Sequence, residues 1–296
     1  MSTPMGDSGM ISATDAPLPV QPSPGSARAV QVTAWLPAFV RRDWKVARSY
    51  RLQFVLDLAA IPLALGLFFY LGRLVDASRV LDGELQQGYF AFGAVGFAVL
   101  GMVQTALISF TGKLRTEQTS GTFEVLMASP VSPSVVVLGS ASFDVIKATV
   151  IATVTLLVAA LFGVRFHLGM GSVAGLLVGV PALIMAFAAL GVLVAACATV
   201  FKQVTALLGL ITSALGLLSG VFFPISYLPQ PLRAIAEALP FTWGVDVLRT
   251  ALLKGELARS RLGLLAGFAV VSLPLSLFLF RLAVDHARRR GTLTHF

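Results

Sequence analysis

The sequence predicts an all-α protein that crosses a membrane several times, and three observations predict it. Of its 296 residues, 56% are hydrophobic, and the mean hydropathy is +0.86. Only 12% are charged, whereas about 25% of the residues of soluble domains carry a charge. The apolar residues also gather into blocks of about 20, the length that a helix needs to cross the hydrocarbon core. These properties exclude an ordinary soluble domain.

The N-terminal part is predicted to lie outside the hydrocarbon core. Residues 1–29 are rich in Ser, Pro, Gly and Ala, and they lack the basic start and apolar run of a signal peptide, so we expect a disordered tail. Residues 32–51 predict an amphipathic helix in the headgroup layer, because Trp44 lies on its apolar face while Arg41 and Lys45 lie on another. The alternative is a plain basic flank of the first span.

A transmembrane region over residues 30–285 is expected to contain six spans. They cover residues 52–72, 89–111, 141–163, 173–200, 204–224 and 262–280. Basic residues are more frequent on the side of the N-terminus, so both termini, including a tail at 286–296, are predicted to lie in the cytoplasm, with the chain in the inner (plasma) membrane. The net charge of +8 then fits anionic membrane lipids as partners, and nucleic acid is not expected.

Three charged residues fall inside the predicted spans. They are Asp57 in the first, and Asp144 and Lys147 in the third. Asp144 and Lys147 are three residues apart on one helix, so we expect them to pair and to lower the cost of burying each charge. The functional alternative is that these charges contact an amphiphilic substrate or a span of a partner.

A polar segment, residues 113–133, separates the second and third spans. Within it, Phe123, Leu126 and Met127 are spaced i, i+3 and i+4, which predicts a short amphipathic helix at the membrane surface. Such a helix is too short to be stable alone, so we expect it to dock on another protein; the alternative is a solvated loop. The docking segment comprises Glu117, Gly121, Thr122, Phe123, Glu124, Leu126, Met127, Ser129 and Pro130.

A long connection, residues 221–261, precedes the last span. It contains two helical stripes of apolar residues, one closed by Pro240 and one ending near Gly255. We predict two short re-entrant helices whose broken backbone is buried in protein; the alternative is a pair of interfacial helices in an aromatic belt. The residues that mark this region are Phe222, Phe223, Pro224, Pro229, Pro240, Asp246 and Arg249.

In these two segments the chain resembles the permease subunits of ABC-2 type ATP-driven transporters, particularly the branch that exports drugs, polysaccharides or nodulation factors. The residues that carry the resemblance are Arg115, Glu117, Gly121, Thr122, Glu124, Leu126, Ser129, Pro130 and Val131, and then Gly220, Phe222, Phe223, Pro224, Leu228, Pro229, Leu232, Ile235, Ala236, Leu239, Pro240, Asp246, Leu248, Arg249 and Gly255. The resemblance implies a half-transporter that pairs with a second permease copy or homologue. It also implies that the docking segment is a coupling helix on a cytoplasmic ATP-binding subunit, and that an amphiphilic drug, lipid or lipid-linked glycan is exported by alternating access.

The chain itself is not expected to be an enzyme or to bind a cofactor. No G-x-x-x-x-G-K-[ST] is present, since Gly112 and Lys113 are followed by Leu114, so ATP and Mg are expected on the partner ATPase subunit. The three histidines are scattered, which predicts no metal site and no catalytic base. Two alternative functions remain open: an ATP-independent carrier, ion-coupled or passive, and a membrane-embedded lipid-modifying enzyme.

Overall fold

The structure is a computed structural model that describes residues 40–45, 48, 51–74, 88–119, 133–200 and 205–289. Over these residues the chain forms helices and connecting turns, with no strand. The long helices are α2 (Arg51–Leu74), α4 (Tyr89–Thr119), α6 (Pro133–Leu161), α7 (Met170–Val200) and α11 (Arg259–Arg289). The shorter ones are α8 (Thr205–Leu218), η2 (Ile225–Tyr227), α9 (Gln230–Ala238), α10 (Pro240–Arg249) and a π-helical turn, η3 (Thr250–Lys254).

Five of the described helices are long and apolar enough to cross a membrane. Their candidate spans are Phe54–Arg73, Tyr89–Phe110, Ala141–Leu161, Met170–Ala198 and Arg259–His286. Each overlaps a span predicted from the sequence, so the all-helical membrane class is confirmed.

The sixth span, predicted over residues 204–224, is not found at that length among the described residues, which begin at Thr205 in this part of the chain. Helix α8 has 14 residues, which cover about 21 Å at 1.5 Å per residue, against roughly 30 Å of hydrocarbon. It ends at Leu218 because Gly220 adopts a left-handed φ of 72° and Pro224 follows. Hydropathy alone did not reveal this break, since residues 219–223 are themselves mostly apolar.

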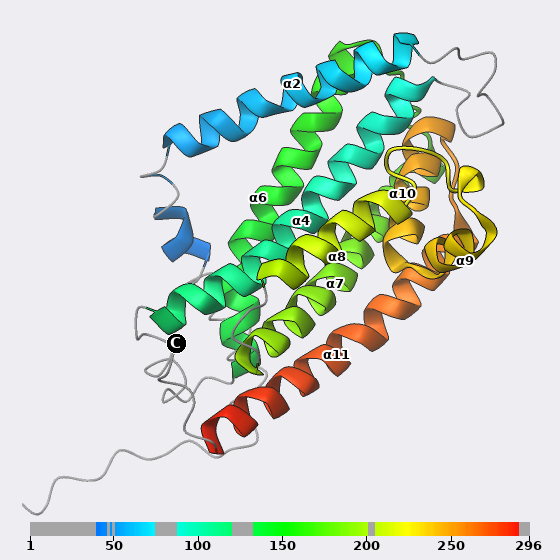
Figure 1. The fold of residues 1–296 in the computed structure, drawn as a ribbon. Helices are drawn as coiled ribbons and strands as arrows, with labels where there is room; N and C mark the ends of the chain where they lie inside the picture. The colour runs from blue at the N-terminus through cyan, green and yellow to red at the C-terminus, as the bar shows by residue number, and fades with distance from the viewer. Residues whose placement is uncertain are drawn as a thin grey trace, which may run out of the picture.

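Helices α4 and α7 form the centre of the bundle. In the most apolar stretches of these two helices, 72% and 56% of the residues are buried. In the corresponding stretches of α2, α6 and α11 only 17–22% are buried. Helix α4 packs between α6 and α7, and α11 packs along α7 (Figure 1). Phe92, Leu107, Leu183, Phe187 and Leu265 are among the fully buried side chains. The outer helices therefore present apolar surface outward, as expected of faces that contact lipid or another subunit.

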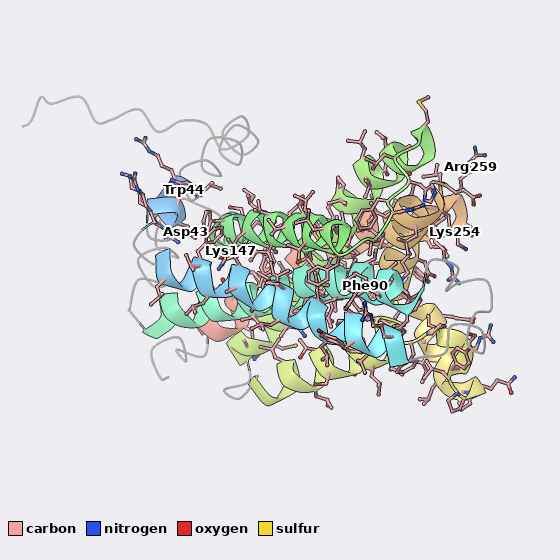
Figure 2. The ribbon with its side chains drawn as sticks, turned by 90° about the horizontal axis from the view of Figure 1, so that it is seen from above. Asp43, Trp44, Phe90, Lys147, Lys254 and Arg259 are labelled. Atoms are coloured by element: carbon pink, nitrogen blue, oxygen red, sulfur yellow. The ribbon has the colours of Figure 1, made fainter. Side chains whose placement is uncertain are left out.

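The bundle has two distinct ends. We call the end with α9 and α10 the distal end, and the end with residues 40–45 and the C-terminal part of α11 the proximal end (Figure 1). Charged side chains lie toward both: Asp43 and Lys147 on the proximal side, and Lys254 and Arg259 on the distal side (Figure 2).

Part of the predicted N-terminal amphipathic helix is described. Residues 40–45 are helical, and the ring of Trp44 contacts that of Phe143 on α6 edge-on, with centroids 6.2 Å apart. Arg42 pairs with the neighbouring Asp43 at 2.9 Å. This segment is thus held against the proximal part of α6, and the remainder of the predicted helix stays a prediction.

Candidate functional site

The distal end is built from short helices, each started by a proline. Pro224 and Pro229 immediately precede η2 and α9, and Pro240 is the first residue of α10. Proline suits these positions because it fixes φ and lacks the N–H that the first turn of a helix leaves unpaired. The structure therefore has short helices in both places where the sequence predicted them.

Helix α10 and the turn η3 lie directly against α7 because glycines remove the intervening side chains. A Cβ added to Gly179 would lie 2.7 Å from Cγ1 of Val247, and one added to Gly171 would lie 2.8 Å from the carbonyl oxygen of Gly255. Gly175, between them, faces Ala251 in the same way. Small residues four apart allow two helix backbones to approach closely. Helix α10 is consequently buried in protein, whereas only Ala236 of α9 is buried, so the re-entrant arrangement of both helices stays a prediction.

Arg249 anchors this unit to the first turn of α4. Its Nε and Nη2 donate to the carbonyl oxygen of Phe92 at 3.3 and 3.1 Å, and Nη2 also donates to that of Val221 at 3.2 Å. The guanidinium carbon lies 3.4 Å from the centroid of the Phe92 ring. A Cβ on Gly96 would lie 2.7 Å from Nη2 of Arg249 and 2.8 Å from the Val221 oxygen. Gly96 thus makes room for the anchor.

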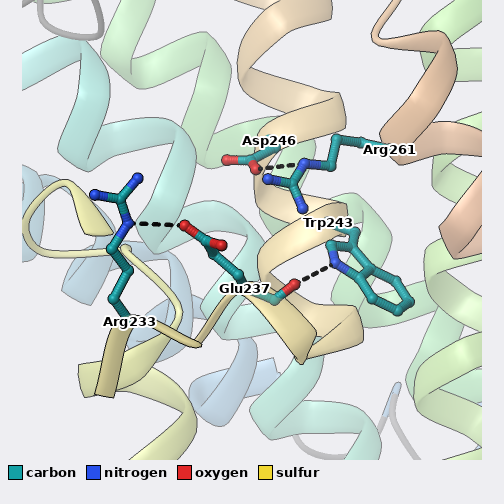
Figure 3. A network of polar contacts seen from close by, with 5 residues as sticks. All are labelled: Arg233, Glu237, Trp243, Asp246 and Arg261. Carbon is teal, nitrogen blue, oxygen red and sulfur yellow. Dashed lines mark hydrogen bonds and ion pairs between the residues drawn. The ribbon is translucent and has the colours of Figure 1, made fainter. Parts of the chain in front are cut away.

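The predicted aromatic residues pack across this region. Phe222 stacks on Phe68 of α2, with ring centroids 6.1 Å apart, while Phe223 is half-buried in the same turn. Trp243 of α10 donates from Nε1 to the carbonyl oxygen of Glu237 at 2.7 Å, and so closes the end of α9 (Figure 3). These contacts fix the turn and α9 relative to the spans.

Two ion pairs flank a pocket at the distal end. Nε of Arg233 lies 2.8 Å from Oε1 of Glu237, one turn later on α9. Nε of Arg261, in the first turn of α11, lies 3.6 Å from Oδ2 of Asp246 on α10 (Figure 3). The pocket between them has a volume of about 130 Å³. It is lined by Ile225, Ser226, Arg233, Glu237, Asp246, Arg249 and Arg261.

The charges inside the spans pair differently from the prediction. Nζ of Lys147 lies 2.7 Å from Oδ2 of Asp57 on α2, and both side chains are 28% exposed. The prediction that Asp144 is the partner of Lys147 was wrong. Asp144 instead accepts a hydrogen bond at 2.5 Å from Oγ of Ser109 on α4. Helix α6 contacts both α2 and α4, and each of its two charges binds a side chain of a different neighbouring helix.

The docking segment lies mostly outside the described residues. Glu117 is on α4, which continues as a helix to Thr119, beyond the predicted end of that span at residue 111. The other eight residues of the docking segment, Gly121 to Pro130, lie outside the described residues. Their assignment stays a prediction.

Several residues of the site were missed by sequence reasoning. The spacing of Arg233 and Glu237, four apart on a helical stripe, was a usable signal for an ion pair. Gly96, Ser109 and Arg261 gave no local signal, because each acts through a partner that is distant in the sequence.

The family of this protein follows from a match between its sequence and a family model. The model of the family described as "ABC-2 type transporter" matches residues 36–253, which include the docking segment and nearly all of the distal unit. The chain belongs to the ABC-2 type transporter family. The resemblance stated from the sequence is confirmed, and the chain is a multi-pass membrane permease.

Three curated relatives share most of their length with this ABC-2 permease, and each is named Nodulation protein J. The one from Rhizobium meliloti (strain 1021) is 28% identical over 255 residues, which is 83% of this chain and 92% of the relative. The one from Rhizobium leguminosarum bv. viciae is 26% identical over 254 residues, or 83% and 93%. That from Sinorhizobium fredii (strain NBRC 101917 / NGR234) is 26% identical over 224 residues, or 74% and 81%.

Proposed function

We propose that this ABC-2 permease is the membrane half of an ATP-driven exporter whose energy comes from a separate ATP-binding subunit. One observation carries the proposal: the family match runs through both segments that the sequence analysis singled out. ATP and Mg are held by the partner subunit, and a second permease copy or homologue completes the transporter. The cargo is an amphiphile: a drug-like molecule, a lipid or a lipid-linked glycan.

The proximal end is proposed to face the cytoplasm, with the chain in the inner membrane and both termini inside. Arg41, Arg42, Lys45 and Arg48 lie on or beside the N-terminal helix of that end, and positive charges favour the cytoplasmic side. By the same assignment α9 and α10 re-enter the outer leaflet. Burial of α10 against α7 supports this, since broken backbone at membrane depth needs protein around it.

Helix α4 is the element that would carry work from the ATPase into the bundle. Its apolar window ends at Phe110, yet the helix continues to Thr119, about 13 Å further at 1.5 Å per residue. The docking segment begins at Glu117, in the last turn of α4, and α4 is the most buried of the five candidate spans. We propose that a push on Phe123, Leu126 and Met127 is transmitted to the core by α4, and that Glu117 and Glu124 pair with basic groups of the partner.

Co-purification tests this function directly. Tagged permease is expected to bring down an ATP-hydrolysing subunit and to transport cargo only with ATP. Phe123→Asp is expected to abolish both capture and transport, because a charge cannot fill an apolar groove, whereas the matched control Phe123→Leu keeps both. Capture of no ATPase, together with ATP-independent transport by the Phe123→Asp variant, would instead establish a carrier of another class.

A further inference from the structure

The pocket at the distal end combines residues from four separate elements. Ser226 comes from η2, Glu237 from α9, Asp246 from α10 and Arg261 from α11, and Arg233 and Arg249 complete its charged lining. The side chains of the two ion pairs are 34–51% exposed, so the charged groups of the pocket can be reached from outside. The pocket is the most polar concave place among the described residues for which a volume is given; a second one, lined by Met102, Leu183, Phe187 and other apolar side chains, measures only about 10 Å³.

The charges of the lining do not balance. Three arginines face two carboxylates, Glu237 and Asp246, so the formal charge of the pocket is +1. The ion pairs of Arg233 and Arg261 engage the Nε atoms. The Nη groups of both forks can thus still donate to a ligand. A guanidinium fork binds the oxygens of phosphate or carboxylate through two parallel hydrogen bonds.

The size of the pocket limits what can enter it. A volume of about 130 Å³ equals roughly four water molecules at about 30 Å³ each. Sites for drug-sized ligands begin at about 300 Å³. The pocket accordingly has room for one compact group, such as a tetrahedral phosphate with its four oxygens, and not for a whole amphiphile.

We propose that this pocket binds one singly charged phosphate group, held by Arg233 and Arg261 with Ser226 beside them. The group is either the phosphodiester of a lipid headgroup or a phosphate free in solution. One negative charge neutralises the formal +1 of the lining, and both guanidinium forks match the oxygens of the group. This binding does not require that the chain be an exporter, so it is tested without ATP or cargo.

Binding is measured on the purified full-length permease in detergent by native mass spectrometry, with phosphatidylglycerol as the lipid probe. One tightly retained phosphatidylglycerol per chain is expected. The double variant Arg233→Gln/Arg261→Gln is expected to bind it about ten-fold more weakly or worse, because two charge-assisted hydrogen-bonded groups are lost. Arg259→Gln is the matched control: an exposed arginine two residues before Arg261 that does not line the pocket. It is expected to bind like the wild type.

Added inorganic phosphate separates the two sources of the group. Displacement of the lipid at millimolar phosphate assigns the site to free phosphate, and retention of the lipid assigns it to the headgroup. Equal retention of phosphatidylglycerol by the wild type and the double variant, with no effect of phosphate, overturns the proposal.

A variant that makes the pocket more positive tests whether the arginine substitutions act only by destabilising the fold. Glu237→Gln raises the formal charge of the pocket to +2 and frees Arg233 from its partner, so it is expected to tighten phosphatidylglycerol binding a few-fold. A pair that only stabilises the fold would give no tightening, and unchanged or weaker binding contradicts the proposal. Since the side chain of Glu237 is 45% exposed, this variant is expected to fold even where the double arginine variant does not.

Discussion

The two ends of the bundle are held together in different ways. At the distal end, Arg249 binds backbone carbonyls of Phe92 and Val221, and glycines set the distances between helices. At the proximal end, continuous helices meet through side-chain pairs, Lys147 with Asp57 and Ser109 with Asp144. A broken helix exposes carbonyls that need donors, whereas an unbroken one satisfies its own backbone. The distal end is thus held in part by hydrogen bonds from Arg249 to backbone carbonyls, whereas the pairs described at the proximal end join side chains to side chains.

From this difference we infer which end of the bundle moves more readily during transport. A small displacement at the distal end must break hydrogen bonds to backbone atoms, while at the proximal end an ion pair can slide between neighbouring helices. We therefore expect distal substitutions to act mainly on folding and proximal substitutions mainly on transport. The single cysteine, Cys197, is a free thiol, so reaction with a thiol-specific dye during heating can follow unfolding of every variant.

The largest effect is expected for Arg249→Met. The change removes a charged donor from two carbonyls and a cation from the ring of Phe92. We expect a loss of about 2–4 kcal/mol, because a hydrogen bond to a charged group contributes about 1.5–3 kcal/mol and a desolvated cation–π contact about 2 kcal/mol. Thermal unfolding measures the loss. Arg259→Met serves as control, and equal stability of the two variants would show that the anchor is dispensable.

Gly96→Ala tests the same anchor from the side of α4. The added methyl would lie 2.7 Å from Nη2 of Arg249 and 2.8 Å from the oxygen of Val221, so overpacking is expected to cost about 1–3 kcal/mol. Gly101→Ala on the same helix has nothing within 4 Å of the new Cβ. It is expected to be neutral or to stabilise by up to about 1 kcal/mol through helix propensity. A loss of stability in Gly96→Ala with no loss in Gly101→Ala would support the difference between the two ends of the bundle. A similar loss in both variants would contradict it.

Lys147→Met breaks the link between α2 and α6. We expect a stability loss of about 1–2 kcal/mol, since Asp57 loses the cation that offsets its partial burial, as measured couplings between membrane helices suggest. Transport is expected to fall more than stability, because the link lies at the end that we expect to move during transport. The exchange Asp57→Lys with Lys147→Asp should restore both. Failure of that exchange, in a double-mutant cycle, would mean that the pair contributes through packing alone.

The smallest effect on stability is expected for Asp144→Asn. The amide oxygen can still accept from Ser109, so only the contribution of the charge is lost, and we expect a loss of about 0.5–1.5 kcal/mol, the difference between a hydrogen bond to a charged group and a neutral one. Assembly with the second permease should weaken in parallel, as co-purified yield would show. Unchanged assembly with selective loss of transport would assign Asp144 to the cargo path instead.

Much of the architecture was predictable because its signals are local. Runs of apolar residues located the five spans that the described residues contain, and the two apolar stripes on either side of Pro240 indicated short helices before the last span. The break after α8 was not predicted, because apolar residues continue through the turn and only the left-handed φ of Gly220 separates them. The role of the docking segment rests on pattern and family alone.

By itself, the sequence determined that this protein is an all-helical membrane permease and which two segments distinguish it. Only the tertiary structure decided that Lys147 pairs with Asp57, 90 residues away, that Arg249 binds Phe92, 157 residues away, and that three arginines share one pocket. Hydropathy and helix termini depend on residues a few positions apart, which a single chain displays directly. The partner of a charge depends on which helix faces lie together, and that is set by the packing of the whole bundle.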